Sequence, residues 1–175
     1  PWSLSGYTDS DWAGDNITRK STSGGIVFRG EHAIKSWSSN QTIIALSSAE
    51  AELYALLKGA SQVLGLKSMG YDFGDELSAG LWSDASAAIA ISQRSGLGKL
   101  RSIQTQYLWL QERVSAKDLS LENVVGTANP ADMLTKHLAK ADLDRHLEFA
   151  NLTVRTGRAD GSLQANALSA WRRPV

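Results

Sequence analysis

The sequence predicts one α/β domain, a five-stranded mixed sheet flanked by helices, with the first three strands antiparallel. Its 175 residues, 42% of them hydrophobic, suffice for one sizeable core and are too few for two ordinary domains. Strand-like segments come first and then alternate with helical ones, which is typical of a mixed α/β sandwich. The links between the first three strands are short, as in antiparallel neighbours.

The three opening strands are expected at 4–9, 23–29 and 33–38. A polar turn over 15–21 separates the first two, and Gly30 with Glu31 separates the second from the third.

A long helix is expected from Ser48, its possible N-cap, to about Leu66, because apolar residues recur there at helical spacing. The segment 70–74 contains two glycines and should break it. The remaining elements are expected as a strand at 79–83, an alanine-rich helix from Asp84 to about Arg94, an amphipathic helix carrying Ile103, Tyr107, Leu110 and Val114, a strand at 119–125, and a helix from Pro130 with a possible continuation through Leu147.

The domain is expected to span 1–150 and to be followed by a basic flexible tail or linker over 151–175, where helical periodicity fades. Residues 1–150 carry 14 basic and 17 acidic side chains, whereas 151–175 carry four basic and one acidic. The chain does not begin with Met and has no signal-like or membrane-spanning apolar run, so we expect a soluble, intracellular, monomeric piece of a longer protein.

Composition limits the possible chemistry. With no cysteine and only three scattered histidines, a thiolate site is excluded and a zinc site is disfavoured. Any metal is therefore expected to be bound by oxygen, with Mg²⁺ the natural candidate. The zero net charge disfavours a purely electrostatic nucleic-acid binder, but it counts less against an enzyme that brings two divalent ions to its substrate.

Four acidic residues stand at the start or edge of expected elements: Asp9, Glu52, Asp84 and Asp132. Carboxylates in these positions can converge on one point. Hydrolysis of a phosphodiester by two metal ions needs such a group, because it must hold ions roughly 3.5 to 4 Å apart.

Each acid also has a simpler interpretation. Asp84 and Asp132 could serve only at helix starts, as a cap and as a favourable charge near the helix dipole. Asp9 could belong to a solvated turn; a calcium loop is excluded because Ala13 and Lys20 replace expected ligands. Glu52 could be a surface charge, and periodicity does not decide between Glu50 and Glu52, which lie about 160° apart around the helix.

Several segments closely resemble the ribonuclease H domain of copia-type retrotransposon polyproteins. They are 7–14, 19–24, 36–41, 45–52, 129–132 and 135–136, and the similarity runs from about Gly6 to Leu138.

This resemblance implies a ribonuclease H-like fold and hydrolysis of the RNA strand of RNA·DNA hybrids during reverse transcription. It implies two Mg²⁺ ions, which Mn²⁺ can replace, held by Asp9, Glu52, Asp84 and Asp132. It also selects Glu52 over Glu50 through the pattern over 52–56. It also implies a reverse transcriptase polymerase domain in the same polyprotein as partner, and a cytoplasmic location in retrotransposon particles. The loop 126–129 lacks the histidine that many ribonucleases H carry before the last acid.

Substrate contacts are expected from polar and basic side chains. Asn40 and Gln41 lie in a polar stretch before the first helix, and such groups suit the reading of a hybrid by shape and 2′-hydroxyl contacts. An ordinary polar loop is the alternative. The candidate phosphate-binding side chains, for which a solvated surface charge is the alternative, are Arg19, Lys20, Lys99 and Arg101.

Two other functions remain open. A catalytically weak or inactive module of this fold could guide substrate or hold a polyprotein together. Exonucleases and integrases of the broader fold also carry acid sets, but the three-strand opening followed by Glu52 on the first helix favours ribonuclease H.

Overall fold

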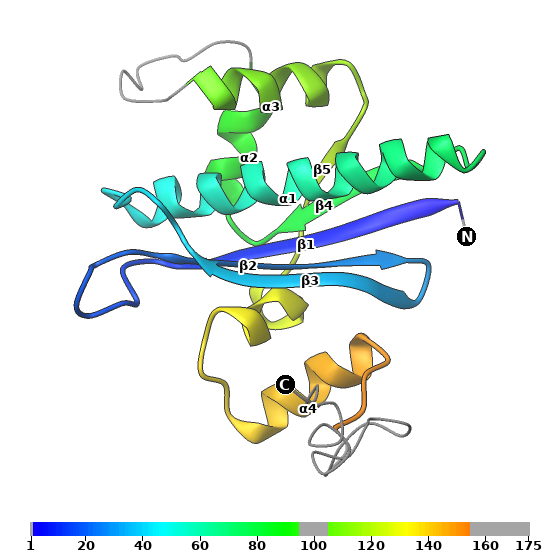
Figure 1. Ribbon diagram of the computed structural model, residues 1–175. Helices are drawn as coiled ribbons and strands as arrows, with labels where there is room; N and C mark the ends of the chain where they lie inside the picture. Colours follow the sequence, from blue (N-terminus) through cyan, green and yellow to red (C-terminus); the bar gives the residue numbers. More distant parts are fainter. Residues whose placement is uncertain (1, 95–104, 155–175) are drawn as a thin grey trace, which may run out of the picture.

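The computed structural model describes residues 2–94 and 105–154, and its centre is a five-stranded sheet (Figure 1). The strand order is β3-β2-β1-β4-β5, so β1 lies in the middle. The strands are β1 (Ser3–Asp11), β2 (Thr22–Arg29), β3 (His32–Asn40), β4 (Ser78–Ser83) and β5 (Ser120–Asn123).

Strand pairing confirms the predicted mixed sheet. β1 pairs antiparallel with β2, and β2 pairs antiparallel with β3. On its other side β1 pairs parallel with β4, which pairs parallel with β5. Parallel neighbours bring their C-terminal ends to one edge of a sheet, so Asp9, near the end of β1, lies beside the end of β4.

Helices cover both faces of the sheet (Figure 1). One face carries α1 (Ser48–Asp72), α2 (Ser86–Gln93) and α3 (Thr105–Ser115), and the main core lies between them and the sheet. The other face carries α4 (Lys140–Phe149) and the short 3₁₀ helix η2 (Pro130–Leu134) over a smaller core. Neighbouring residues of β2 point alternately to the two cores, as strand geometry requires, with Val27 in the first and Ile26 and Phe28 in the second.

Helix α1 runs to Asp72, further than the predicted end at about Leu66, and it stops within the segment 70–74 that was expected to break it. Gly70 is buried inside the helix, where a Cβ would lie 2.6 Å from Leu77 Cδ1, so the glycine allows close packing. The chain leaves the helix at Phe73 and turns at Gly74, whose φ of +85° suits glycine. The N-cap is Ser47 rather than Ser48.

The end of the domain also differs from expectation. The segment from Pro130 forms the short helix η2, and α4 is a separate helix on the same face. Expectations for Ile103, Lys99, Arg101 and the tail from 155 onward fall outside the described residues. None of the helices in the described ranges has the length and apolar character that crossing a bilayer requires.

Candidate active site

Three of the four predicted acids meet at the C-terminal edge of β1 and β4. Asp9 lies on β1, Asp84 directly follows β4, and Glu52 lies near the start of α1. Each offers a carboxylate oxygen, and these oxygens all lie within 4.8 Å of one another. The ligand type suits a shared divalent cation, since carboxylate oxygens are the ligands that Mg²⁺ prefers.

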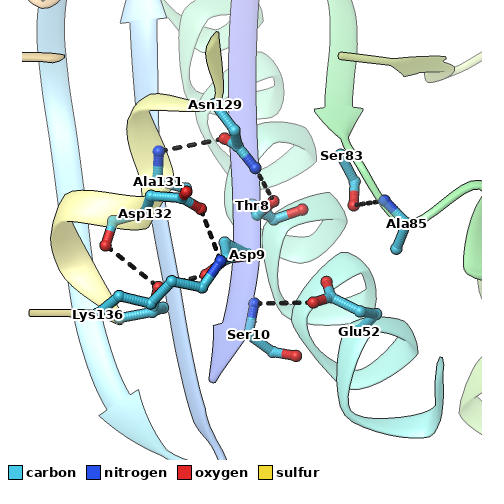
Figure 2. A network of polar contacts seen from close by, with 11 residues as sticks. Thr8, Asp9, Ser10, Glu52, Ser83, Ala85, Asn129, Ala131, Asp132 and Lys136 are labelled. Atoms are coloured by element: carbon cyan, nitrogen blue, oxygen red, sulfur yellow. Dashed lines mark hydrogen bonds and ion pairs between the residues drawn. The ribbon is translucent and has the colours of Figure 1, made fainter. Parts of the chain in front are cut away.

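Glu52 is the acid most perturbed by this arrangement. Its Oε1 accepts a hydrogen bond from the Ser10 backbone N–H at 3.3 Å, whereas Oε2 is buried with no hydrogen-bond partner (Figure 2). Burial, and then the charge of Asp9, raise the pKa of Glu52 to about 8 against the opposing hydrogen bond from Ser10. An oxygen buried without a partner fits a site that is completed by a cation.

Glu50 has a different role, because it takes part in the hydrogen bonds at the N-terminus of α1. Its Oε2 accepts the Leu46 N–H at 2.8 Å, while Ser47 Oγ accepts the Glu50 N–H at 3.2 Å. This pair resembles a capping box, except that the Glu50 carboxylate accepts from Leu46, the residue before the N-cap, and not from the N-cap itself. Glu50 therefore closes the end of α1, and Glu52 is the glutamate that joins Asp9 and Asp84.

Asp84 does not cap the helix that follows it, so the simpler interpretation of this residue is wrong. The N-cap of α2 is Ala85, which has no side-chain cap bond. The Ala85 N–H instead donates to Ser83 Oγ at 3.1 Å (Figure 2). The Asp84 carboxylate belongs to the three-acid group. Gly126 approaches it closely, since a Cβ there would lie 3.0 Å from Asp84 Oδ2.

Asp132 stands outside the three-acid group but is held against β1. Asn129 is the N-cap of η2, and its Oδ1 accepts the Ala131 N–H at 3.1 Å. Its Nδ2 donates to the Thr8 carbonyl at 3.0 Å, next to Asp9 (Figure 2). Asn129 is fully buried. It therefore fixes the start of η2, and with it Asp132, beside the central strand.

Lys136 links Asp132 to Asp9. Its ammonium donates to Asp9 Oδ1 at 3.1 Å and to Asp132 Oδ1 at 3.0 Å (Figure 2). The Thr135 hydroxyl donates to the other oxygen of Asp9. Burial lowers the pKa of Lys136, but the charge of Asp9 and the hydrogen bonds to both aspartates outweigh it, so the net shift is upward. Burial raises the pKa of Asp132, while the hydrogen bond from Lys136 opposes that shift.

The predicted substrate-contact residues that fall within the described ranges lie beside this group or at the same edge of the sheet. Gln41 is buried, and its Nε2 donates to Ser23 Oγ and to the Ala51 carbonyl, both at 2.9 Å. Asn40 is exposed at the end of β3. Arg19 and Lys20 lie on the turn between β1 and β2, Arg19 exposed and Lys20 half-buried. A pocket next to this edge is lined by Ser23, Ser39, Asn40, Gln41, Thr42, Ile43, Tyr54 and Lys58.

Sequence reasoning assigned no role to two basic residues. Lys136 has a local signal, because it follows Asp132 by four residues, the spacing of a helical ion pair. No local sequence signal indicates its contact with Asp9, which lies 127 residues away along the chain. Lys58 donates to Ser39 Oγ across the pocket, and only the packing of α1 against the sheet brings these residues together.

Comparison with known proteins identifies relatives among mobile elements. No protein-family model matches the chain. A retrovirus-related Pol polyprotein from transposon TNT 1-94 of Nicotiana tabacum is 34% identical over 135 residues, 76% of this chain. The corresponding polyprotein from transposon RE2 of Arabidopsis thaliana is 32% identical over 159 residues, 89% of the chain. The chain spans about 10% of the length of each.

Solved structures agree on the fold. LC11-RNase H1, isolated from compost, matches with a TM-score of 0.59 and 15% identity, over 84% of this chain and 99% of its own. The same enzyme in complex with an RNA/DNA hybrid matches with a TM-score of 0.55 and 16% identity, over 75% and 93% of the two chains. The chain described here therefore has the ribonuclease H-like fold and is homologous to a segment of the retrovirus-related Pol polyproteins of plant transposons.

Proposed function

We propose that this chain is a ribonuclease H that hydrolyses the RNA strand of RNA·DNA hybrids during retrotransposon reverse transcription. The observation that carries the proposal is the meeting of Asp9, Glu52 and Asp84, with one oxygen of each within 4.8 Å. Support comes from the fold shared with an enzyme crystallised with an RNA/DNA hybrid and from homologous transposon Pol polyproteins.

The proposed metal ligands are Asp9, Glu52, Asp84 and Asp132, and the proposed cofactor is a pair of Mg²⁺ ions that Mn²⁺ can replace. When bound, such ions supply the activation of a water molecule and the stabilisation of the leaving oxygen. The protein contributes by holding and orienting the carboxylates. Glu52 must lose its proton to act as a ligand, which its raised pKa makes costly below about pH 8 unless a cation is present.

The pocket lined by Gln41 and Lys58 is our candidate contact surface for the hybrid. Both N–H groups of the Gln41 amide are already donated within the protein, and Oε1 is buried without a partner. Gln41 Oε1 is therefore the atom left to accept a hydrogen bond from a ribose hydroxyl, and because this atom is buried, the pocket would have to open for that contact. We propose that Asn40, Arg19 and Lys20 contact the hybrid at the same edge, and that Lys99 and Arg101 contribute further phosphate contacts.

The direct test is cleavage of a hybrid with labelled RNA, with Mg²⁺, with Mn²⁺ and with EDTA. We expect RNA fragments with 3′-hydroxyl and 5′-phosphate ends, no cleavage in EDTA, and no cleavage of duplex DNA or duplex RNA. Asp84→Asn should abolish the products, whereas Asp144→Asn should not, because Asp144 is an exposed partner of Lys140 on α4. Equal cleavage by wild type and Asp84→Asn would refute the assigned site.

One observation favours the alternative, a weak or inactive module that guides substrate. Lys136 already neutralises part of the charge that would attract a metal between Asp9 and Asp132. The same assay decides between the two functions. Binding of the hybrid without cleavage in either metal would establish the alternative.

We further propose that residues 1–150 are the folded unit and that 151–175 form a basic tail. We also propose that the chain is monomeric and acts beside a reverse transcriptase polymerase domain of the same polyprotein, in cytoplasmic particles. The homologous polyproteins support this setting. Limited proteolysis should cut within 151–175 and spare the remainder. Copurification of the polymerase domain with this chain tests the partnership.

A further inference from the structure

The two sides of the carboxylate site are neutralised differently. In the described part of the chain, no basic side chain pairs with Glu52 or Asp84, whereas Lys136 pairs with both Asp9 and Asp132. Asp9 is only 1% exposed and the Lys136 side chain is 38% exposed, so the pair is formed with a buried carboxylate.

The backbone holds Lys136 in this position. The Lys136 N–H donates to the Asp132 carbonyl at 3.0 Å, and the Thr135 N–H donates to the same carbonyl at 3.2 Å. This turn continues η2 and returns the lysine side chain to Asp132, four residues earlier. Thr135 donates its hydroxyl to Asp9 from the same turn. The contact with Asp9 is thus built into the end of η2.

An ammonium and a divalent ion cannot occupy the same space between two carboxylates. The Lys136 nitrogen lies 3.1 Å from Asp9 Oδ1 and 3.0 Å from Asp132 Oδ1. Mg²⁺ binds its oxygen ligands at about 2.0–2.1 Å, so an ion bridging these two oxygens would take the place of the ammonium. An ion held by Asp9, Glu52 and Asp84 would share only Asp9 with Lys136.

We propose that the Lys136 ammonium is a built-in counter-cation, which holds Asp9 and Asp132 together in the metal-free protein and must leave before a divalent ion can bind between them. This inference rests on the metal site of the proposed function. It gives the two ion positions unequal affinities, because only the ion between Asp9 and Asp132 competes with a cation of the chain itself. The weaker ion would then bind only after Lys136 has moved away.

The test uses the whole chain, stripped of metal with EDTA, and Mn²⁺ alone as the probe, without any hybrid. Calorimetry and the electron paramagnetic resonance of free Mn²⁺ give the number of bound ions and their dissociation constants, and thermal unfolding in EDTA gives the metal-free stability. Lys136→Met removes the charge and keeps the length of the side chain. Lys140→Met is the matched control, because Lys140 also pairs with an aspartate four residues away but on the exposed face of α4.

For Lys136→Met we expect the weaker Mn²⁺ to bind about tenfold more tightly or better, since a charge-assisted hydrogen-bond network no longer competes. Its melting temperature in EDTA should fall by about 4 °C or more, and Mn²⁺ should restore it. Lys140→Met should behave as wild type in both measurements. Unchanged or weaker Mn²⁺ binding by Lys136→Met would overturn the proposal, as would the failure of both proteins to bind a second ion.

Lys136→Arg decides the matter if the methionine variant does not fold with or without Mn²⁺. A guanidinium keeps its charge and pairs strongly with carboxylates. The weaker Mn²⁺ should then bind no better than in wild type, and tighter binding would overturn the proposal. None of these readouts uses cleavage, so loss of the proposed ribonuclease activity and loss of this inference are separate results.

Discussion

The repulsion among the clustered carboxylates is reduced differently on the two sides of the site, the side of α1 and the side of η2. Toward α1, the half-buried Glu52 lies beside Asp9 and Asp84 without a cation from the described part of the chain. Its pKa rises to about 8, so the metal-free protein reduces the repulsion by keeping a proton on Glu52. Toward η2, Asp9 and Asp132 share the ammonium of Lys136. The described part of the chain therefore supplies a cation on the η2 side and none on the α1 side.

The largest effect is expected at Asp9, which belongs to both sides. Asp9→Asn should reduce hydrolysis of a hybrid about a thousandfold or more, because a shared ligand is worth several kcal/mol in the transition state. In EDTA the variant should also be less stable, since Lys136 and Thr135 lose a charged acceptor.

Single-turnover cleavage and urea unfolding check both expectations. Asp11→Asn is the control on the same strand, because Asp11 is not part of the three-acid group. A fully active Asp9→Asn protein would remove Asp9 from the site.

The second effect separates two glutamates of one helix. Glu52→Gln should lower the rate of hydrolysis by two orders of magnitude or more, on the scale of losing a group that acts on transition-state charge. Glu50→Gln should keep most of the activity, because the amide oxygen of glutamine can accept the same Leu46 N–H at the start of α1. Rates under saturating Mg²⁺ measure the difference, and the reverse order of activities would show that Glu50 is the ligand.

The third effect is a pH dependence of metal-free stability that comes from the Glu52 side. The folded protein raises the pKa of Glu52 from 4.5 to about 8, so the folded state binds the proton more tightly than the unfolded state does. The free energy of unfolding should therefore fall as pH rises from about 4.5 to 8, by up to a few kcal/mol.

Urea unfolding in EDTA at several pH values measures this slope. Glu52→Gln should flatten it and be more stable than wild type at pH 8. A slope that is the same in both proteins would mean that Glu52 does not carry the buried proton.

The smallest effect is the loss of stability when either of two asparagines is replaced, Asn129 on the η2 side or Asn123 beside Asp84. Asn129→Ala should cost about 1–3 kcal/mol of stability, because it removes a buried hydrogen bond to the Thr8 carbonyl and the cap of η2. Asn123→Ala should cost less than about 0.5 kcal/mol, because Asn123 is exposed and its bond to the Asp84 carbonyl is 3.5 Å long. Thermal unfolding tests the pair, and equal losses would contradict the different anchoring of the two sides.

Local pattern was enough to predict most of the fold. Alternating residues and short links gave the three antiparallel strands, and helical spacing gave α1, because both signals lie within a few neighbouring residues. The end of α1 was expected at about Leu66 but lies at Asp72, since the close contact of Gly70 with Leu77 in the last turns of the helix comes from packing. The split between η2 and α4 was missed for a related reason, because their apolar residues face the same side of the sheet.

The sequence by itself determined which acids were candidates, since order and setting singled out Asp9, Glu52, Asp84 and Asp132. Only the tertiary structure decided how they are used. In the folded chain Glu52 lies beside Asp9, whereas Glu50 accepts a hydrogen bond at the start of α1. Asp84 does not cap α2, and Lys136 forms an ion pair with Asp9. The physical reason is that these charge interactions act over a few ångströms in space, whereas the residues that meet here are separated by up to 127 positions along the chain. Local periodicity in the sequence does not indicate such contacts.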